Sequence, residues 1–141
     1  MSRLADPPDI RLKRAYEPTS PEDGARVLID RLWPRGVTKA KAAIKHWFRD
    51  LAPSTELREW FGHDVSRWDE FQRRYAAELN SHGDQLDELC ALARRGPVTL
   101  IYAARDEEHN DAVVLKQAIL KRWNAEPDCR DREVHSGSHH L

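Results

Sequence analysis

The segment from Val98 to Ala104, with the sequence Val-Thr-Leu-Ile-Tyr-Ala-Ala, limits the possible folds more than any other part of the chain. It is short, apolar and rich in β-branched residues, so it is typical of a β-strand. A strand without alternating polar residues is buried on both faces, as in the interior of a parallel sheet. Because parallel strands are joined by helical crossovers, the segment predicts an α/β fold.

Two earlier segments are expected to join the same sheet. Ile10 to Tyr16 alternates apolar and basic residues, which is typical of a half-buried strand. Arg26 to Trp33 contains Val-Leu-Ile and is bounded by Gly24 and Pro34, which favours a short strand buried on both faces. If these strands are parallel neighbours of Val98 to Ala104, their carboxyl ends meet at one edge of the sheet.

The segment from Thr38 to Ala52 fits two patterns. Its apolar residues can form a helical face, but the alternation at Ile44, His46 and Phe48 also fits a strand. Periodicity alone does not decide between the two in so short a run. We expect a helical turn over Lys39 to Ala42, followed by a short strand.

Caps and apolar stripes predict the remaining helices. Ser54 or Thr55 can begin a short helix that runs through Phe61 and ends at Gly62. The next helix begins at Asp64 or Ser66, another ends at Gly96-Pro97, and the last is capped by Asn110. Their stripes, which we expect to face the core, are Trp68, Phe71, Tyr75 and Leu79, then Leu86, Leu89, Cys90 and Ala93, then Ala112, Leu115, Ile119 and Trp123.

Strands interleaved with helices predict a single α/β domain of three layers, in which helices flank an open, mostly parallel sheet. The chain has 141 residues, and two domains of half that length would be too small to bury a sizeable core. We assign the domain to residues 10–125. Residues 1–9 are expected to be a flexible N-terminus, and residues 126–141 a disordered polar tail.

The charge balance gives no sign of a polyanionic partner. With 23 Lys plus Arg and 24 Asp plus Glu, the net charge is −1, so there is no strong signal for nucleic-acid binding. No apolar run approaches the roughly 20 residues that cross a bilayer, so no membrane and a cytoplasmic location are expected. Cys90 and Cys129 form neither a disulfide framework nor a zinc knuckle, and no metal or cofactor is expected. The sequence predicts no particular oligomeric state.

The first group of candidate binding residues lies where the strand from Arg26 runs out, in Asp-Arg-Leu-Trp-Pro-Arg-Gly, residues 30–36. Arg31 and Arg35 flank a Trp-Pro turn and can present planar guanidinium groups to a carboxylate or a phosphate. The alternative is structural: Asp30 pairs with Arg31, and Trp33 belongs to the core.

The second group lies in the loop and helix start after Tyr102. Ligands of open α/β sheets bind outside the carboxyl ends of the strands, and the free amides of a helix N-terminus favour an anion. Arg105, His109 and the amides near Asn110 would then meet Arg31 and Arg35. The alternative is that Asp106, Glu107 and Glu108 only place negative charge near the start of the last helix, and that Asn110 is only a cap.

The folded part of the chain also carries a series of motifs: Leu12-Lys13-Arg14, Val27 to Gly36, Leu51 to Arg58, Trp60-Phe61, and Val98 to Asn110. This series, which covers about Ile10 to Leu120, resembles the YeaO-like branch of the bacterial family called domain of unknown function 488. The resemblance implies a small α/β protein with no established activity.

The resemblance also implies a difference in chemistry from many members of the wider family. Those members carry a cysteine at the end of the last core strand, then a glutamate, and a Cys-His-Arg triplet that opens the following helix. Here Tyr102 and Ala104 stand in the places of the cysteine and the glutamate, and His109-Asn110-Asp111 stands in the place of the triplet. A thiol nucleophile is therefore not available at this edge of the sheet.

Three functions remain open, since the common enzyme signatures are absent from the sequence. The first is a binding module for a small anionic or phosphorylated ligand, held by Arg31, Arg35, Arg105 and Asn110. The second is an enzyme with His109 as acid or base, oriented by Asp106 or Asp30, and with the Tyr102 hydroxyl as donor. The third is a structural or interaction protein, whose arginines at this edge are paired internally. In the absence of a ligand, Asp30, Asp106 and Glu107 are expected to neutralise the arginines.

Overall fold

The structure is a computed structural model and describes residues 7–125. The expected disordered tail and most of the expected flexible N-terminus lie outside the described residues. Within them, the chain forms a single α/β domain with an open parallel sheet, which confirms the predicted fold class. None of the described helices is long and apolar enough to cross a membrane.

The sheet consists of β1 (Ile10–Arg14), β2 (Ala25–Leu28), β3 (His46–Trp47) and β4 (Val98–Tyr102), in the order β1-β4-β2-β3. All three pairings are parallel. The strand β4, which comes last along the chain, is therefore interior, and every one of its residues is buried. The apolar run at Val98 is explained by this position, because a central strand packs against other elements on both faces.

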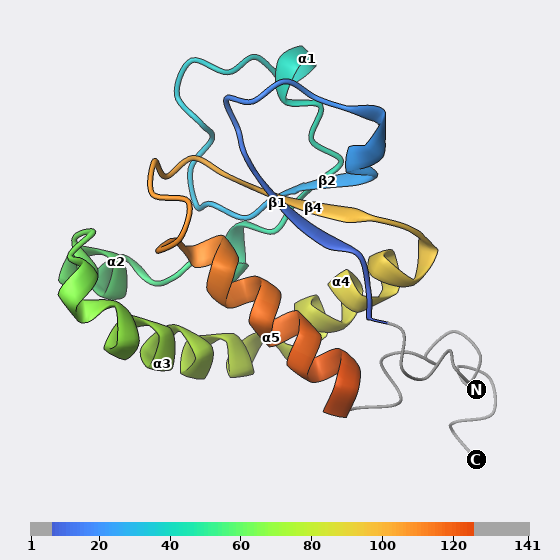
Figure 1. The fold of residues 1–141 in the computed structure, drawn as a ribbon. Helices are drawn as coiled ribbons and strands as arrows, with labels where there is room; N and C mark the ends of the chain where they lie inside the picture. Colours follow the sequence, from blue (N-terminus) through green and yellow to red (C-terminus); the bar gives the residue numbers. More distant parts are fainter. Residues whose placement is uncertain (1–6, 126–141) are drawn as a thin grey trace.

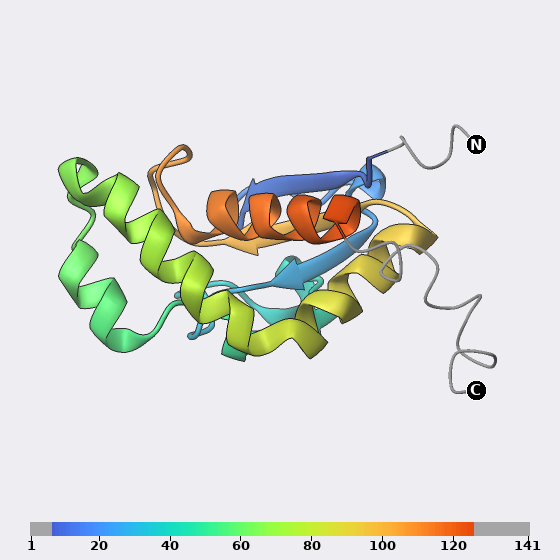
Figure 2. The same ribbon diagram turned by 90° about the horizontal axis from the view of Figure 1, so that it is seen from below.

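The helices are α1 (Lys39–Ala42), α2 (Thr55–Phe61), α3 (Trp68–Leu79), α4 (Gly83–Arg95) and α5 (Asp111–Ala125). The expected helical turn and short strand in the ambiguous segment are α1 and β3. Short 3₁₀ turns add η2 (Pro21–Asp23), η3 (Arg49–Leu51), η4 (Val65–Arg67) and η5 (Asn80–His82). Helices α3, α4 and α5 lie over one face of the sheet, while α1 and its flanking loops lie over the other (Figures 1 and 2).

Polar caps begin α2 and α5 where the sequence indicates them, whereas Asp64 caps the 3₁₀ turn η4 and α3 begins only at Trp68. The hydroxyl of Ser54 accepts a hydrogen bond from the Leu57 amide at 3.1 Å, and α2 ends at Gly62, which has a φ of 51°. Asn110 caps α5, because its side-chain oxygen accepts from the Val113 amide at 3.2 Å. These caps satisfy amides that have no partner within the helix, so the helix starts are fixed by local sequence.

Alternate residues of the central strands supply two cores. Val98, Leu100 and Tyr102 of β4 pack with α3, α4 and α5 in the large core, and Phe71 and Tyr75 are buried there as expected. Ile101 faces the other way, into a small cluster with Ala15 and Leu28, partly covered by Trp33, Ile44 and Trp47. The layer on this second face is thinner, because short segments cover it instead of long helices.

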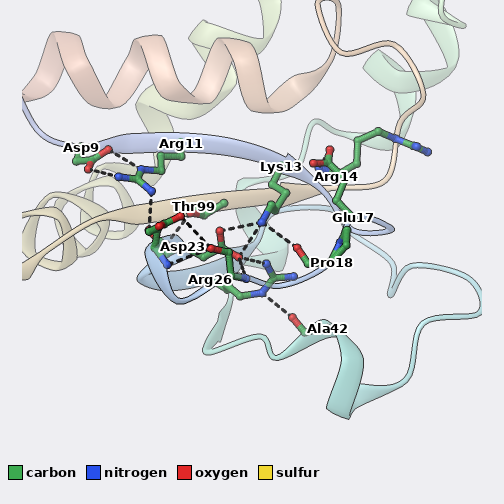
Figure 3. A network of polar contacts seen from close by, with 12 residues as sticks. Asp9, Arg11, Lys13, Arg14, Glu17, Pro18, Asp23, Arg26, Ala42 and Thr99 are labelled. Atoms are coloured by element: carbon green, nitrogen blue, oxygen red, sulfur yellow. Dashed lines mark hydrogen bonds and ion pairs between the residues drawn. The ribbon is translucent and has the colours of Figure 1, made fainter.

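A buried ion network stabilises the second face of the sheet, on which the small cluster lies (Figure 3). The carboxylate of Asp23 accepts hydrogen bonds from Lys13 Nζ at 2.9 Å and from Arg26 Nη1 at 2.6 Å. Arg26 Nε also donates to the Ala42 carbonyl at 2.8 Å, and the Thr99 hydroxyl donates to the Asp23 carbonyl at 2.7 Å. The network therefore joins η2, α1 and three strands.

The strands are shorter than the sequence predicts, and the difference positions the candidate site. The segment predicted as a strand to Trp33 ends its ladder at Leu28, although the Ile29 amide still donates to the Ile101 carbonyl at 3.2 Å. At Asp30 the chain turns away, because the Asp30 carboxyl and carbonyl bond to other segments. The residues after Ile29 thus leave the sheet at the carboxyl end of β2.

Candidate ligand-binding site

A cavity of about 490 Å³ opens where β2 and β4 end. The loop from Asp30 to Arg35, helix α2, the segment after β4 and the first residues of α5 line it. Figure 1 shows α2 and the beginning of α5 at the end of the sheet to which the carboxyl ends of these strands point. This is the position in which open α/β sheets bind ligands.

Asp30 connects the carboxyl ends of β2 and β4. Its Oδ2 accepts a hydrogen bond from the Ala103 amide at 2.9 Å, and its backbone carbonyl accepts from Trp47 Nε1 at 2.7 Å. Burial raises the pKa of the Asp30 carboxyl, although the Ala103 amide, Asp111 and the positive charge of Arg58 act in the opposite direction. Asp30 is therefore held in one orientation at the wall of the cavity.

Asp111, the first residue of α5, places a second carboxyl beside the first. The side chains of Asp30 and Asp111 are hydrogen-bonded to each other, and both residues line the cavity. Burial, followed by the charge of Asp30, raises the pKa of Asp111 well above its usual range. Two carboxylates so close cannot both ionise at low cost. The Asp111 carboxyl therefore holds its proton more tightly than a free aspartic acid does.

Three arginines line the same cavity: Arg31, Arg35 and Arg58. Arg31 Nη2 donates to the Pro53 carbonyl at 3.3 Å, and Arg31 Nε is shielded from solvent without a hydrogen-bond partner. Among the described residues, none of the three forms an ion pair with a carboxylate.

The expected internal neutralisation of Arg31 and Arg35 is therefore wrong. Asp30 bonds to Asp111 and to a backbone amide, and Asp106 bonds to His109. The alternative pairing of Asp30 with Arg31 is not formed either, since the side chains of these sequence neighbours take different partners. The arginine charge in the cavity is left without a partner among the described side chains.

His109 lies at the border of the cavity and is held by Asp106. The distance from His109 Nδ1 to Asp106 Oδ2 is 3.0 Å, and the His109 ring makes an edge contact with Trp68, with 5.2 Å between ring centroids. Hydrogen bonds from the amides of Glu108 and His109 lower the pKa of Asp106, and the His109 side chain adds to this effect. Asp106 is therefore ionised and orients the imidazole.

The structure brings together some of the residues predicted for the site and not others. Arg31, Arg35, His109 and Asn110 line the cavity, as does Asp30. Arg105 is exposed and is not among the lining residues, and neither is Tyr102, which is buried in the large core.

Sequence reasoning missed Arg58 and Asp111. Asp111 follows a helix cap, where an acidic residue is ordinary, and Arg58 lies on a short helix with no unusual pattern. Nothing in the local sequence distinguishes either residue from a surface charge. Within residues 7–125, no three side chains of the metal-binding types come together as a candidate metal site.

The chain is similar in sequence to a family model and to several bacterial proteins. A family model described as "Inactive DUF488-N3 subclade" matches residues 9–139. The uncharacterized protein YeaO of Escherichia coli is 41% identical over 107 residues, which are 76% of this chain and 93% of YeaO. The uncharacterized protein Mb3100c of Mycobacterium bovis is 44% identical over 113 residues, or 80% of this chain and 95% of that protein. No solved structure matches the chain.

Proposed function

Because the chain belongs to the inactive DUF488-N3 subclade, we propose that it is a binding protein for a small ligand with an anionic group, such as a phosphate ester. The observation that carries the proposal is the set of unpaired arginines in one cavity. Arg31, Arg35 and Arg58 bring three positive charges to the carboxyl ends of the strands. An oxyanion would neutralise them with short, charge-assisted hydrogen bonds.

The remaining groups of the cavity fit the same function. Burial raises the pKa of both Asp30 and Asp111, so these two carboxyls ionise less readily than free aspartates. The lining holds three arginines and three carboxyl groups, and two of these carboxyl groups resist ionisation. A volume of about 490 Å³ suits a small molecule.

The test is a calorimetric titration of the full chain with inorganic phosphate and with ethyl phosphate. Arg35→Ala should weaken the binding of both at least about tenfold, since hydrogen bonds between charged groups contribute roughly 1.5–3 kcal/mol. Arg105→Ala is the matched control, because Arg105 carries the same charge on a neighbouring loop but does not line the cavity. Equal losses in the two variants, or no binding by the unmodified chain, would contradict the proposal.

A second candidate function, acid–base catalysis on the same ligand, is favoured by one observation. The contact of His109 Nδ1 with Asp106 fixes the imidazole and leaves its Nε2 available to exchange a proton. The test is to incubate the protein with ethyl phosphate and to follow the phosphorus NMR signal. Release of inorganic phosphate that His109→Asn abolishes would support catalysis, while binding without conversion would leave the binding function alone.

A further inference from the structure

We propose that the ligand of this cavity carries a bulky apolar group beside its anionic group, and that Tyr16 and Leu32 bind the apolar part. The ligand is then a phosphate ester whose alcohol part is apolar. This inference rests on the proposed function, because it names the class of ligand for the same site.

The first observation is where the exposed apolar side chains lie. Among residues 7–125, three large apolar side chains are exposed: Tyr16 at 48%, Leu32 at 69% and Val65 at 52%. Tyr16 and Leu32 both line the cavity with the arginines, and Val65 does not. Exposed apolar residues scattered singly are ordinary, but apolar surface gathered at one place marks a binding site. Because Tyr16 and Leu32 line the cavity and also face solvent, they lie where the cavity opens.

The second observation is that the Tyr16 ring is held in place although it is exposed. Its hydroxyl donates to the Arg35 carbonyl at 3.2 Å, and the Arg14 guanidinium lies over the ring, 5.2 Å from its centroid. Arg14 is fixed in turn, because its Nε donates to the Ala104 carbonyl at 2.8 Å. Arg14 is not among the lining residues, so the ring surface that lines the cavity stays open to a ligand. A side chain that is fixed before binding loses little conformational entropy on binding.

The third observation is that the neighbours of Leu32 hold it outside the core. Trp33 Nε1 donates to the Val37 carbonyl at 2.6 Å, and on the other side Arg31 Nη2 donates to the Pro53 carbonyl at 3.3 Å. Leu32 belongs to neither core cluster. The fold therefore gains little from its apolar side chain, whereas a ligand that covers Leu32 removes apolar surface from water.

The apolar and the charged groups form one continuous surface. Leu32 directly follows Arg31 in the chain, and the Tyr16 hydroxyl bonds to the carbonyl of Arg35, so each apolar side chain adjoins an arginine. Small-molecule sites combine apolar lining with a few charged groups that fix the orientation of the ligand. A ligand with a small anionic group alone would leave Tyr16 and Leu32 in water. An apolar group on the same ligand would cover both.

The experiment compares three phosphate monoesters by calorimetry with the full chain at pH 8, where each is fully ionised: ethyl phosphate, phenyl phosphate and cyclohexyl phosphate. The three esters carry the same charged group and differ in the apolar area that binding can bury. At least one of the two ring esters should bind about tenfold more tightly than ethyl phosphate. The tighter ring ester identifies the apolar group as aromatic or aliphatic, because stacking on Tyr16 favours a planar ring.

Three variants test whether these two residues make the contact. Leu32→Ser and Tyr16→Ser should each reduce the preference for the ring ester at least about threefold, because each removes apolar surface at the cavity. Val65→Ser is the matched control, since it makes the same kind of change at an exposed apolar residue that does not line the cavity, and it should keep the preference. A preference that survives in both cavity variants would overturn the inference.

Failure of this inference and failure of the proposed function give different results. If the three esters bind equally and Arg35→Ala weakens all of them, the apolar group is refuted and the anion site stands. If none of the esters binds, both proposals are overturned. Analytical ultracentrifugation tests another occupant of the apolar surface. A dimer that Leu32→Ser dissociates would show that a second copy of the chain covers Leu32, which would also overturn the inference.

Discussion

Asp30 and Asp111 bond to each other through their carboxyl groups at the point where β2 has ended and α5 begins. This contact joins the loop after β2 to the helix after β4, at the wall of a cavity that three arginines also line. A contact between two carboxyl groups destabilises the folded state unless one of them keeps its proton. The pair therefore affects the stability of the protein, and it lies in the cavity to which the proposed function is assigned.

The first prediction is that Asp111→Asn stabilises the protein at neutral and alkaline pH. The pKa of Asp111 in the folded chain lies well above the usual value of 3.8, so the folded state binds more protons than the unfolded state once the pH exceeds 3.8. Stability therefore falls as the pH rises from about 4 towards the raised pKa. Asparagine keeps a donor to Asp30 and does not titrate.

Urea denaturation of both proteins at pH 4, 6 and 8 measures this effect. The free energy of unfolding of Asp111→Asn should exceed that of the unmodified chain by an amount that grows with pH. Parallel pH profiles of the two proteins would contradict a raised pKa of Asp111.

The second prediction is that Asp23→Ala destabilises the protein by about 3 kcal/mol. Asp23 is only 5% exposed, and its removal leaves the buried guanidinium of Arg26 without its carboxylate. The same substitution at Glu70, whose partners Arg73 and Arg74 lie on the surface, should cost much less. Thermal melts of the two variants at pH 7 provide the comparison, and similar losses would show that the ion network is not structural.

The Asp23 network also predicts a loss of stability in acid. Burial alone would raise the pKa of Asp23, but hydrogen bonds from Lys13, the Ser20 amide and Arg26 together lower it below 3.8. The stabilisation is present above the unfolded pKa and is lost as the pH falls through the lower folded pKa. Melting temperatures between pH 5 and pH 2 should fall in the unmodified chain more steeply than in Asp23→Ala.

The third prediction concerns Phe71, which is 2% exposed and stacks on Phe61 with 4.5 Å between ring centroids. Phe71→Ala should lower the free energy of unfolding by about 3–5 kcal/mol, because it leaves a hole in the large core. Val65→Ala, at a residue that is 52% exposed, is the control and should change stability little. Chemical denaturation measures both, and unchanged stability of Phe71→Ala would be incompatible with a buried stripe on α3.

The fourth prediction compares two glycines with positive φ. Gly24 has a φ of 63°, and a Cβ there would clash with the carbonyl oxygen of Pro97, whereas Gly36 has a φ of 79° and open space around it. Gly36→Ala should therefore cost only the backbone strain, about 1–2 kcal/mol. Gly24→Ala should cost more, since it also separates β2 from the segment before β4. Equal melting temperatures of the two variants would disprove the close approach at Pro97.

Much of the fold can be predicted from local sequence. The apolar run at Val98 indicates an interior strand, and the caps at Ser54 and Asn110 mark where α2 and α5 begin. These features depend on neighbours within a few residues, through hydrogen bonds to free amides and through burial on both faces of a strand. The topology rule for parallel sheets also predicts the edge at which the cavity lies.

The sequence by itself thus determined the α/β class, the main elements and the edge of the sheet that carries the candidate site. Only the tertiary structure decided which charges meet there. Arg58 lines the cavity, whereas the predicted residue Arg105 does not. The partner of Asp30 is Asp111 and not Arg31, its neighbour in the chain. The reason is physical, because a carboxyl keeps or loses its proton according to its burial and to the charges within a few ångströms. Those distances join segments far apart in the sequence, and the packing of α2 and α5 against the strand ends sets them.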